Sequence, residues 1–258
     1  MYERFWSVYP FACGIKKGTL TKCQYYNSNK EKKIPLSDIL LSYGDNVLLT
    51  DSTGLAYGKT HKGAIERGLL EVCERHLLQK SWYSNKKLIL LRTRGLEQID
   101  AKIKTFMLDG FQSIPFIVSF VIKNNNKFIT GGSSMKKKLS ESIEKAEQEA
   151  LMIAVSIENK LVPTYKNIDL QDKYKNLSGK DVISKINHLN KKIVPKKNKL
   201  SNKTHSIEYI LKKTFKQKKT LVCTIHKSPG DYVVRVIIEG AKKPRDKQGK
   251  IYPQDPFS

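Results

Sequence analysis

Acidic residues are scarce in this sequence of 258 residues, which has 24 Asp and Glu against 48 Lys and Arg and a formal net charge of +24. Such an excess of positive charge is typical of proteins that bind nucleic acids or anionic surfaces. The lysines, however, gather in segments with few apolar residues and do not interleave with aromatic residues that could stack on bases. A basic nucleic-acid-binding protein is therefore one interpretation, and a general enrichment in lysine and asparagine is the other.

Several other features are missing. The four cysteines, Cys13, Cys23, Cys73 and Cys223, form no CxxC pair, so neither a zinc site nor a disulfide framework is predicted. No signal peptide and no apolar run of membrane-spanning length occurs, which favours a reducing, cytoplasmic location and no membrane partner. The Walker sequence GxxxxGK[ST] is also absent, and a P-loop nucleotide site is thereby excluded.

The stretch from residue 51 to residue 82 combines a small-residue loop with a long helix. The hydroxyl-rich segment from Ser52 to Thr60 is predicted to be flexible, with Thr60 as the helix N-cap. From Ala64 onward the apolar residues recur with a period near 3.6, which predicts a helix of at least four turns. Glu71 and Glu74 then share one face. One interpretation makes them surface partners of nearby arginines, and the other makes them ligands.

An internal repeat favours the second interpretation. Residues 54 to 74 can be laid over residues 132 to 152 without a gap. The overlay pairs Gly54 with Gly132, Ile65 with Ile143, Glu66 with Glu144 and Glu71 with Glu149. Two similar units that each present a glutamate predict a pseudo-symmetric pair whose carboxylates converge on a hard cation such as magnesium. Glu74 has no acidic counterpart, because Met152 stands at its position.

The segment TGLAYGKTHKGAIERGLLEVCERH resembles the signature of the YcaO family, a small-residue turn followed by a helix with two glutamates and an arginine. The segment GGSSMKKKLSESIEKAEQEALM resembles the family's later helix, which ends in a glutamate and, three residues on, a glutamine. The resemblance implies an ATP site in which glutamates hold magnesium ions. It makes Glu71, Glu74 and Glu149 metal and phosphate-site residues, and adds Ser52 and either Arg75 or Arg67 to the nucleotide site. Met152 replaces the expected glutamine.

Both ends of the chain resemble the family in part. Glu3 and Arg4 are similar to the end of an earlier glutamate motif, which implies that Glu3 belongs to the nucleotide site and that the chain is incomplete at its N-terminus. The alternative is an ordinary exposed glutamate. The tail IYPQDPFS is similar to the proline-rich C-terminus of azoline-forming YcaO enzymes, which implies a catalytic role for Pro256 and Ser258. The alternative is a terminus without a role.

The remaining pattern predicts an α+β fold with mixed sheets and packed helices, in a single YcaO-like domain over residues 1–258. The predicted strands are Leu88 to Leu91, Ile114 to Ile122, Phe128 to Thr130, Thr220 to Ile225 and Tyr232 to Ile238. The predicted helices are Leu96 to Leu108, the one that carries Glu149, Lys180 to Leu189 and Ser206 to Phe215. A loop is predicted at Ser133 and Ser134, and a Lys/Asn-rich, partly mobile insertion at about 161–204.

The resemblance implies an ATP- and Mg2+-dependent cyclodehydratase that modifies the backbone of a ribosomally synthesised peptide, most of all by closing Cys, Ser or Thr side chains to azolines. It implies a precursor peptide as substrate and an E1-like or leader-peptide-binding protein as partner, with a homodimer as a further option. One alternative is a catalytically incomplete YcaO-like fragment that acts as a partner subunit. The other is the basic nucleic-acid-binding protein, for which charge is the sole support.

Overall fold

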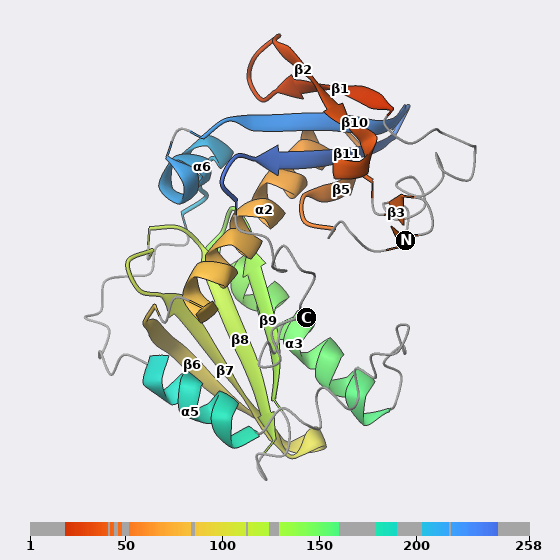
Figure 1. Cartoon of the computed structure of the whole chain (residues 1–258). Coiled ribbons are helices and arrows are strands. Elements are labelled where there is room, and N and C mark those ends of the chain that lie inside the picture. The colour runs from red at the N-terminus through yellow and green to blue at the C-terminus, as the bar shows by residue number, and fades with distance from the viewer. Residues whose placement is uncertain are drawn as a thin grey trace. The chain divides into compact units, whose positions relative to one another are not determined.

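The computed structural model describes residues 19–40, 42–43, 46–47, 52–83, 86–111, 113–123, 129–159, 179–189, 203–216 and 218–241. The chain divides into two compact units, which we call unit 1 and unit 2 (Figure 1). Unit 1 comprises Met1–His76 and Ile207–Lys250, and unit 2 comprises Leu77–Ser206 and Ile251–Ser258. Each unit has its own antiparallel sheet, so each is described separately.

Unit 1 is built on a five-stranded sheet with the strand order β2-β1-β10-β11-β5, in which all neighbouring strands are antiparallel. The strands are β1 (Leu20–Tyr25), β2 (Glu31–Pro35), β5 (Leu55–Gly58), β10 (Thr220–Ser228) and β11 (Asp231–Ile238). A short 3-10 helix (Leu36–Asp38), the two-residue strands β3 (Ser42–Tyr43) and β4 (Asn46–Val47) and helix α6 (Ile207–Phe215) complete its described elements. The first and last thirds of the sequence thus share one sheet.

The long helix α2 (His61–Tyr83) follows β5 directly, as the sequence predicts. Thr60 caps it, because the Gly63 amide donates a hydrogen bond of 3.0 Å to the Thr60 hydroxyl. The helix lies close to the sheet at Gly68, where an added Cβ would be 2.9 Å from the Gly54 carbonyl oxygen and 2.7 Å from a Val236 methyl group. A glycine at this position therefore lets α2 pack directly on β11 and on the turn before β5.

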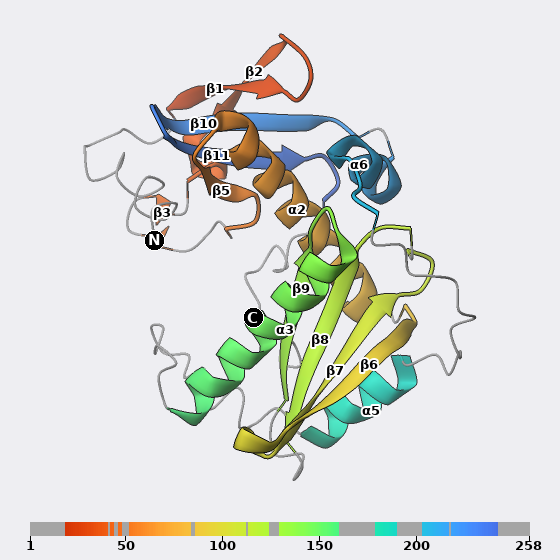
Figure 2. The same cartoon turned by 180° about the vertical axis from the view of Figure 1, so that it is seen from behind.

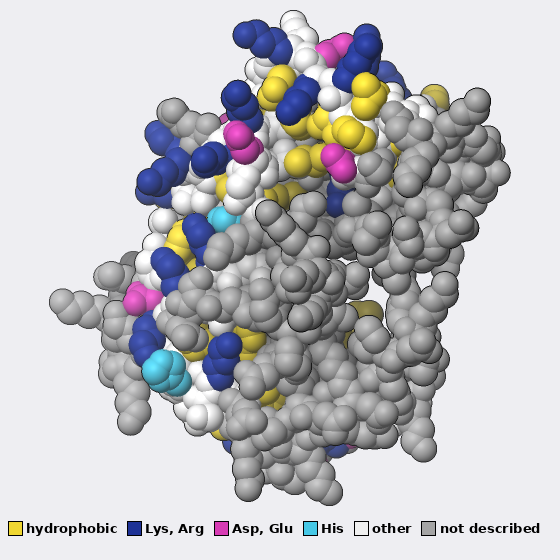
Figure 3. All heavy atoms as spheres, in the orientation of Figure 1, with side chains coloured by type: hydrophobic (Ala, Val, Ile, Leu, Met, Phe, Trp, Pro, Cys, Tyr) yellow, Lys and Arg dark blue, Asp and Glu magenta, His cyan; other side chains and the backbone are white. Residues whose placement is uncertain are grey.

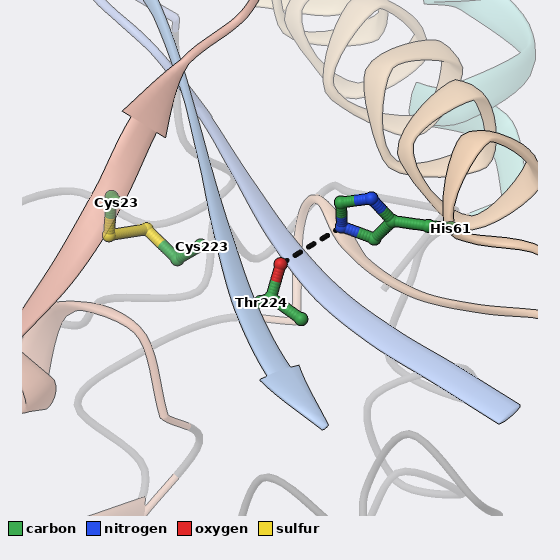
Figure 4. Close-up of a disulfide and its surroundings, with 4 residues drawn as sticks. All are labelled: Cys23, His61, Cys223 and Thr224. Atoms are coloured by element: carbon green, nitrogen blue, oxygen red, sulfur yellow. Dashed lines mark hydrogen bonds between the residues drawn. A yellow bond between two sulfur atoms is a disulfide. The ribbon is translucent and has the colours of Figure 1, made fainter. Parts of the chain in front are cut away.

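A disulfide joins Cys23 of β1 to Cys223 of β10 (Figure 4). The two residues are cross-strand neighbours, since Gln24 pairs with Val222 in the same antiparallel ladder, and both side chains are 1% exposed. The prediction from cysteine spacing that no disulfide forms is therefore wrong. The two cysteines are 200 residues apart, and only the pairing of β1 with β10 brings them together. Figure 4 also shows His61, at the start of α2, hydrogen-bonded to Thr224 at 2.9 Å.

Unit 2 contains a four-stranded antiparallel sheet in the order β6-β7-β8-β9. Its strands are β6 (Leu88–Leu96), β7 (Ala101–Leu108), β8 (Phe116–Lys123) and β9 (Ile129–Met135), and a 3-10 turn (Glu97–Ile99) joins the first two. Helix α3 (Leu139–Glu158) packs on β8 and β9. Helix α5 (Gly179–Leu189) lies on the opposite face of the sheet (Figures 1 and 2).

The helix predicted from Leu96 to Leu108 is wrong, because most of this segment is strand β7. Ile99, Ile103 and Met107 are four residues apart, a spacing that suits one face of a helix and also one face of a strand. The pairing of β7 with both β6 and β8 decides in favour of the strand. Ile103 and Met107 are at most 1% exposed, whereas the lysines on either side of Ile103, at 102 and 104, are only partly buried.

Two segments predicted to be loops are strands. Ser133 and Ser134 lie inside β9, and Leu55–Gly58 within the predicted flexible segment is β5. Runs of glycine and serine are typical of loops, but here they allow a helix to approach a strand closely, as the site below shows. The other predicted helices and strands have counterparts, and the α+β class is confirmed.

Some predictions lie outside the described residues. These are Phe128, the first residue of one predicted strand, and all of the insertion at 161–204 except α5 and residues 203–204. Within the described part of the chain, no helix is long and apolar enough to cross a membrane.

Candidate functional site

Glu71 occupies the inner side of α2 in unit 1, next to the turn that precedes β5. Its pKa is raised to about 7 overall. Burial is the main cause and the charge of Glu74 adds to it, whereas the charges of Arg75 and Arg235 lower the pKa. A hydrogen bond from the Gly54 backbone also favours the ionised form. Glu71 is therefore not the solvated surface glutamate of the simpler interpretation. It is a partly buried carboxyl group with two arginines within electrostatic reach.

Arg235 is a candidate site residue to which the sequence interpretation gave no role in the site. It lies in β11, directly opposite Leu55 of β5, and only 4% of it is exposed. One signal was present in the sequence: Arg235 is the single charged residue between Tyr232 and Ile238, in a strand otherwise made of apolar residues. A buried arginine within electrostatic reach of a glutamate is a candidate for binding phosphate, because the guanidinium group stays charged and pairs with two oxygens at once.

Arg67 and Ser52 contribute to the same region in different ways. Arg67 donates a hydrogen bond of 3.3 Å to the Tyr57 carbonyl oxygen, so it fastens the start of α2 to β5. The Ser52 carbonyl oxygen accepts a hydrogen bond of 2.9 Å from the Leu55 amide, which closes the turn before β5, while Ser52 itself is exposed. Ser52 thus shapes the turn whose Gly54 backbone contacts Glu71.

Glu149 has an equivalent setting within unit 2. Its carboxylate accepts a hydrogen bond of 3.1 Å from the Ser133 amide of β9. Gly132 makes this approach possible, because a Cβ at that position would lie 2.2 Å from the Ala146 carbonyl oxygen and 3.1 Å from the Glu149 Cβ. The Thr130 hydroxyl adds a hydrogen bond of 2.8 Å to the Ala150 carbonyl oxygen. Helix α3 therefore lies directly on β9, and its glutamate is held by the strand backbone.

The internal repeat seen in the sequence is present in the structure. Helices α2 and α3 begin at His61 and Leu139, which are separated by the same offset as Gly54 and Gly132. In each copy the glycine before the helix lies against the middle of that helix, Gly54 near Val72 of α2 and Gly132 near Ala150 of α3. In each copy a backbone amide of the preceding segment binds the carboxylate that follows. The predicted internal repeat is therefore confirmed, but each copy consists of a strand and a helix where the sequence predicted a loop and a helix.

A second glutamate of α3 anchors the helix to the sheet of unit 2. Glu147 is 4% exposed and accepts hydrogen bonds from Arg92 Nε at 2.8 Å, Arg94 Nη2 at 3.2 Å and Thr105 Oγ1 at 2.5 Å. Burial raises the pKa of Glu147, but the bonds from Arg92 and Thr105 and the charges of both arginines outweigh this effect and lower the pKa overall. Glu147 is thus a fixed anion that ties α3, the helix that also carries Met152, to the sheet of unit 2.

The remaining predicted site residues have different outcomes. Met152, at the position of the expected glutamine, is 66% exposed. Glu74 and Arg75 are partly buried on α2, and both interact electrostatically with Glu71. Glu3, Pro256 and Ser258 lie outside the described residues.

The acidic residues of unit 1 fit a magnesium ion that is bound together with phosphates. No group of three or more His, Cys, Asp or Glu residues that could hold a metal ion occurs within the described ranges. Magnesium commonly takes only one or two carboxylates from the protein and completes its octahedral shell with nucleotide phosphates and water. Glu71 and Glu74 offer such a pair, and burial together with the charge of Glu74 raises the pKa of Glu71 although Arg75 and Arg235 lower it, so a cation beside the two carboxylates would favour the ionised form of Glu71.

Comparison with known proteins assigns the family. Residues 16–242 match the model of the YcaO cyclodehydratases, a family described as ATP- and Mg2+-binding, and the chain belongs to this family. ATP and Mg2+ are accordingly the cofactors of this family. No curated protein sequence matches the chain significantly.

Solved structures share the fold at low sequence identity. A heterocyclase in complex with substrate and cofactor gives a TM-score of 0.68 at 18% identity, over 86% of this chain and 33% of that one. The E. coli microcin synthetase McbBCD complex gives 0.62 at 14% identity, over 85% and 64%. YcaO from Methanopyrus kandleri, bound with AMPPCP and Mg2+, gives 0.56 at 12% identity, over 90% and 67%. This chain spans about a third of the length of the first of these proteins.

Proposed function

We propose that the chain takes part in an ATP-dependent cyclodehydration of a ribosomally synthesised peptide and supplies magnesium- and phosphate-binding residues for it. Membership of the YcaO family supports the reaction class. The observation that carries the proposal is the repeated strand–helix element, which fixes Glu71 in unit 1 and Glu149 in unit 2 through backbone amides. Such fixed carboxylates suit magnesium, because a preorganised ligand needs little reorganisation when the cation binds.

In the proposed reaction a Cys, Ser or Thr side chain attacks the carbonyl carbon of the preceding amide. The amide oxygen takes the phosphoryl group of ATP and leaves as phosphate, so that the peptide loses one water overall and an azoline ring forms. Bound magnesium would offset the negative charge of the phosphates. As the family resemblance implies, Glu71, Glu74 and Glu149 would be magnesium ligands, while Arg75 and Arg235 would bind phosphate oxygens. Pro256 and Ser258 are proposed to act near the peptide, as the tail's resemblance implies.

The nucleotide site can be tested with three variants. Saturating magnesium-ATP is expected to raise the thermal midpoint of the parent chain by about 5 °C or more, the size expected for a ligand well above its dissociation constant. Glu71→Gln and Glu149→Ala should abolish most of this rise. Glu144→Ala is the matched control and should keep the full rise, since Glu144 is an exposed residue of the helix that carries Glu149 and its carboxylate accepts a hydrogen bond of 3.2 Å from Gln148.

Two results would contradict the proposed site. One is a parent chain whose midpoint does not respond to magnesium-ATP. The other is an equal loss of response in Glu149→Ala and Glu144→Ala.

A separate test addresses the tail: removing Pro253 to Ser258 should slow ATP-dependent loss of water from a Cys-containing peptide and leave the nucleotide-induced rise in midpoint intact.

A second candidate function is that of a partner subunit without catalytic activity of its own. Met152 favours it, because a 66% exposed thioether stands where the family has a glutamine. The two functions differ in the effect of Met152→Gln. This change should increase magnesium-ATP affinity if the residue faces the nucleotide, and should change nothing if the chain only supports another enzyme.

The proposed reaction also defines partners and location. The substrate would be a precursor peptide, and an E1-like or leader-peptide-binding protein would present it. We place the reaction in the cytoplasm, where ATP is available. In that compartment thiols keep most disulfides reduced, so the Cys23–Cys223 pair would be expected to exchange with the thiol pool.

A further inference from the structure

Unit 1 contains a cavity of about 610 Å3 that shares no residue with the Glu71 site. We call it the lysine groove. One wall is the turn after β1, and the other is α6 with the segment that leads into β10. The described residues that line it are Tyr25, Tyr26, Asn27, Ser28, Lys30, Glu208, Leu211, Lys212, Phe215, Lys216, Lys218, Lys219 and Thr220.

The inner surface of the lysine groove is largely apolar and well anchored. Tyr25, Tyr26, Leu211 and Phe215 supply its aromatic and aliphatic surface. The Tyr26 amide donates a hydrogen bond of 2.9 Å to the Thr220 carbonyl oxygen, which ties the turn to the start of β10. The Tyr26 hydroxyl donates a second bond of 3.2 Å to the Glu208 carboxylate, which ties the turn to α6. The two walls are therefore held at a fixed separation.

The rim of the lysine groove is strongly basic. Five of the described residues that line it are exposed lysines, and Glu208 is the one acidic residue among them. Figure 3 shows Lys and Arg side chains gathered around the position of α6, with hydrophobic and acidic side chains between them. Like charges placed around one cavity repel each other unless an anion binds, so the arrangement favours an acidic ligand.

We propose that the lysine groove binds an acidic segment of a partner polypeptide, which inserts an apolar side chain between Tyr26 and Phe215 while its carboxylates pair with the lysines. Charge complementarity selects an acidic partner, and the apolar interior selects one that also carries an aromatic or aliphatic residue. Glu208 favours a polypeptide over a nucleic acid, because a carboxylate inside the groove repels a continuous row of phosphates but accepts hydrogen bonds from peptide amides.

Fluorescence anisotropy with the full-length chain tests this proposal without ATP or magnesium. The probe is a fluorescein-labelled heptapeptide with one phenylalanine between two runs of three glutamates. We expect binding that weakens at high salt, and at least tenfold weaker binding in the double variant Lys212→Glu, Lys219→Glu. Replacing the phenylalanine of the probe by glycine should also weaken binding at least fivefold.

The double variant Lys32→Glu, Lys33→Glu is the matched control. It makes the same charge change on the exposed residues of β2, in the same unit but outside the groove, and it should weaken binding less than twofold. An equal loss in both double variants would overturn the proposal, as would a probe that binds equally well without its phenylalanine. So would tighter binding of a labelled thymidine heptanucleotide than of the peptide. Glu71→Gln should not change the result, which separates this test from that of the nucleotide site.

Discussion

At the scale of single residues, Glu71 shows how a buried carboxyl group can reduce the stability of the chain that carries it. Its pKa is raised from 4.5 to about 7, mainly by burial. Between these pH values the folded chain holds a proton that the unfolded chain has released. Stability therefore falls as the pH rises from about 4.5 to about 7, and the full cost is present above pH 7.

Glu71→Gln should consequently stabilise the metal-free chain. Because the cost of ionising Glu71 is full at pH 8 and small at pH 5, we expect the midpoint of Glu71→Gln to exceed that of the parent by a few degrees at pH 8 and by less at pH 5. Thermal unfolding followed by circular dichroism measures both. Glu144→Gln is the control and should behave like the parent at either pH. A gain that is the same at pH 5 and pH 8 would show that ionisation is not its cause.

Glu147 presents the opposite case, a carboxylate whose pKa is lowered in the folded chain. Glu147→Ala should reduce the free energy of unfolding by about 2 kcal/mol, because it leaves Thr105 and two half-exposed arginines without their shared acceptor. The difference from the parent should be constant above pH 4.5 and shrink as the pH falls below it. Urea unfolding at pH 7 and pH 3.5 measures this difference. Glu144→Ala should stay within about 0.5 kcal/mol of the parent.

Sequence reasoning finds residues whose role depends on local spacing and misses those whose role depends on distant partners. Glu71 and Glu149 were predicted because they occupy the same position in two similar segments. Glu147 was not, since its partners at 92, 94 and 105 belong to β6 and β7, a hairpin that the sequence interpretation did not recognise. Arg235 stood out only as a charge in an apolar strand.

At the scale of elements, close contact between strand and helix is what makes the two copies alike. Gly132 has no positive φ, so its requirement for glycine is purely steric. The small-residue runs before α2 and α3 look like loops in the sequence because glycine and serine favour turns. In the folded chain the same residues remove side-chain volume beneath a helix, which only the tertiary packing reveals.

Gly132→Ala should destabilise unit 2. Its new Cβ would lie 2.2 Å from a backbone oxygen of α3, so the helix must move, at a cost of about 1–3 kcal/mol. Gly95→Ala is the matched control in the same sheet, because nothing lies within 4 Å of its added Cβ. Denaturant unfolding of the two variants compares them directly. If Gly95→Ala lost as much stability as Gly132→Ala, close packing could not be the reason.

The misassigned segment 96–108 illustrates a limit of periodicity. Its apolar residues fit both a helix and a strand, and the decisive information is the presence of two neighbouring strands, which lie before and after it in the chain. The helix at 207–215 was predictable because its apolar residues follow a helical period without an equally good strand pattern.

At the scale of the whole molecule, the Cys23–Cys223 bridge should contribute to stability. Closing so long a loop restricts the unfolded chain, which typically stabilises the folded one by about 2–4 kcal/mol. Dithiothreitol should therefore lower the thermal midpoint of the parent. The double variant Cys23→Ala, Cys223→Ala should have a lower midpoint than the oxidised parent, and dithiothreitol should not change it. Titration of the unfolded parent should find two fewer thiols before reduction than after it. A midpoint that ignores dithiothreitol in the parent would argue against the bridge.

The bridge also closes the chain from Cys23 to Cys223 into a covalent ring, with a segment of chain on either side of it. A single cut of the backbone anywhere between Gln24 and Val222 would open the ring without releasing a fragment. On a gel run without thiol, a protein nicked once in this span would migrate as one species, and only reduction would separate its two pieces. Limited proteolysis of this protein has to be followed under both conditions, because unreduced gels would hide such cleavage.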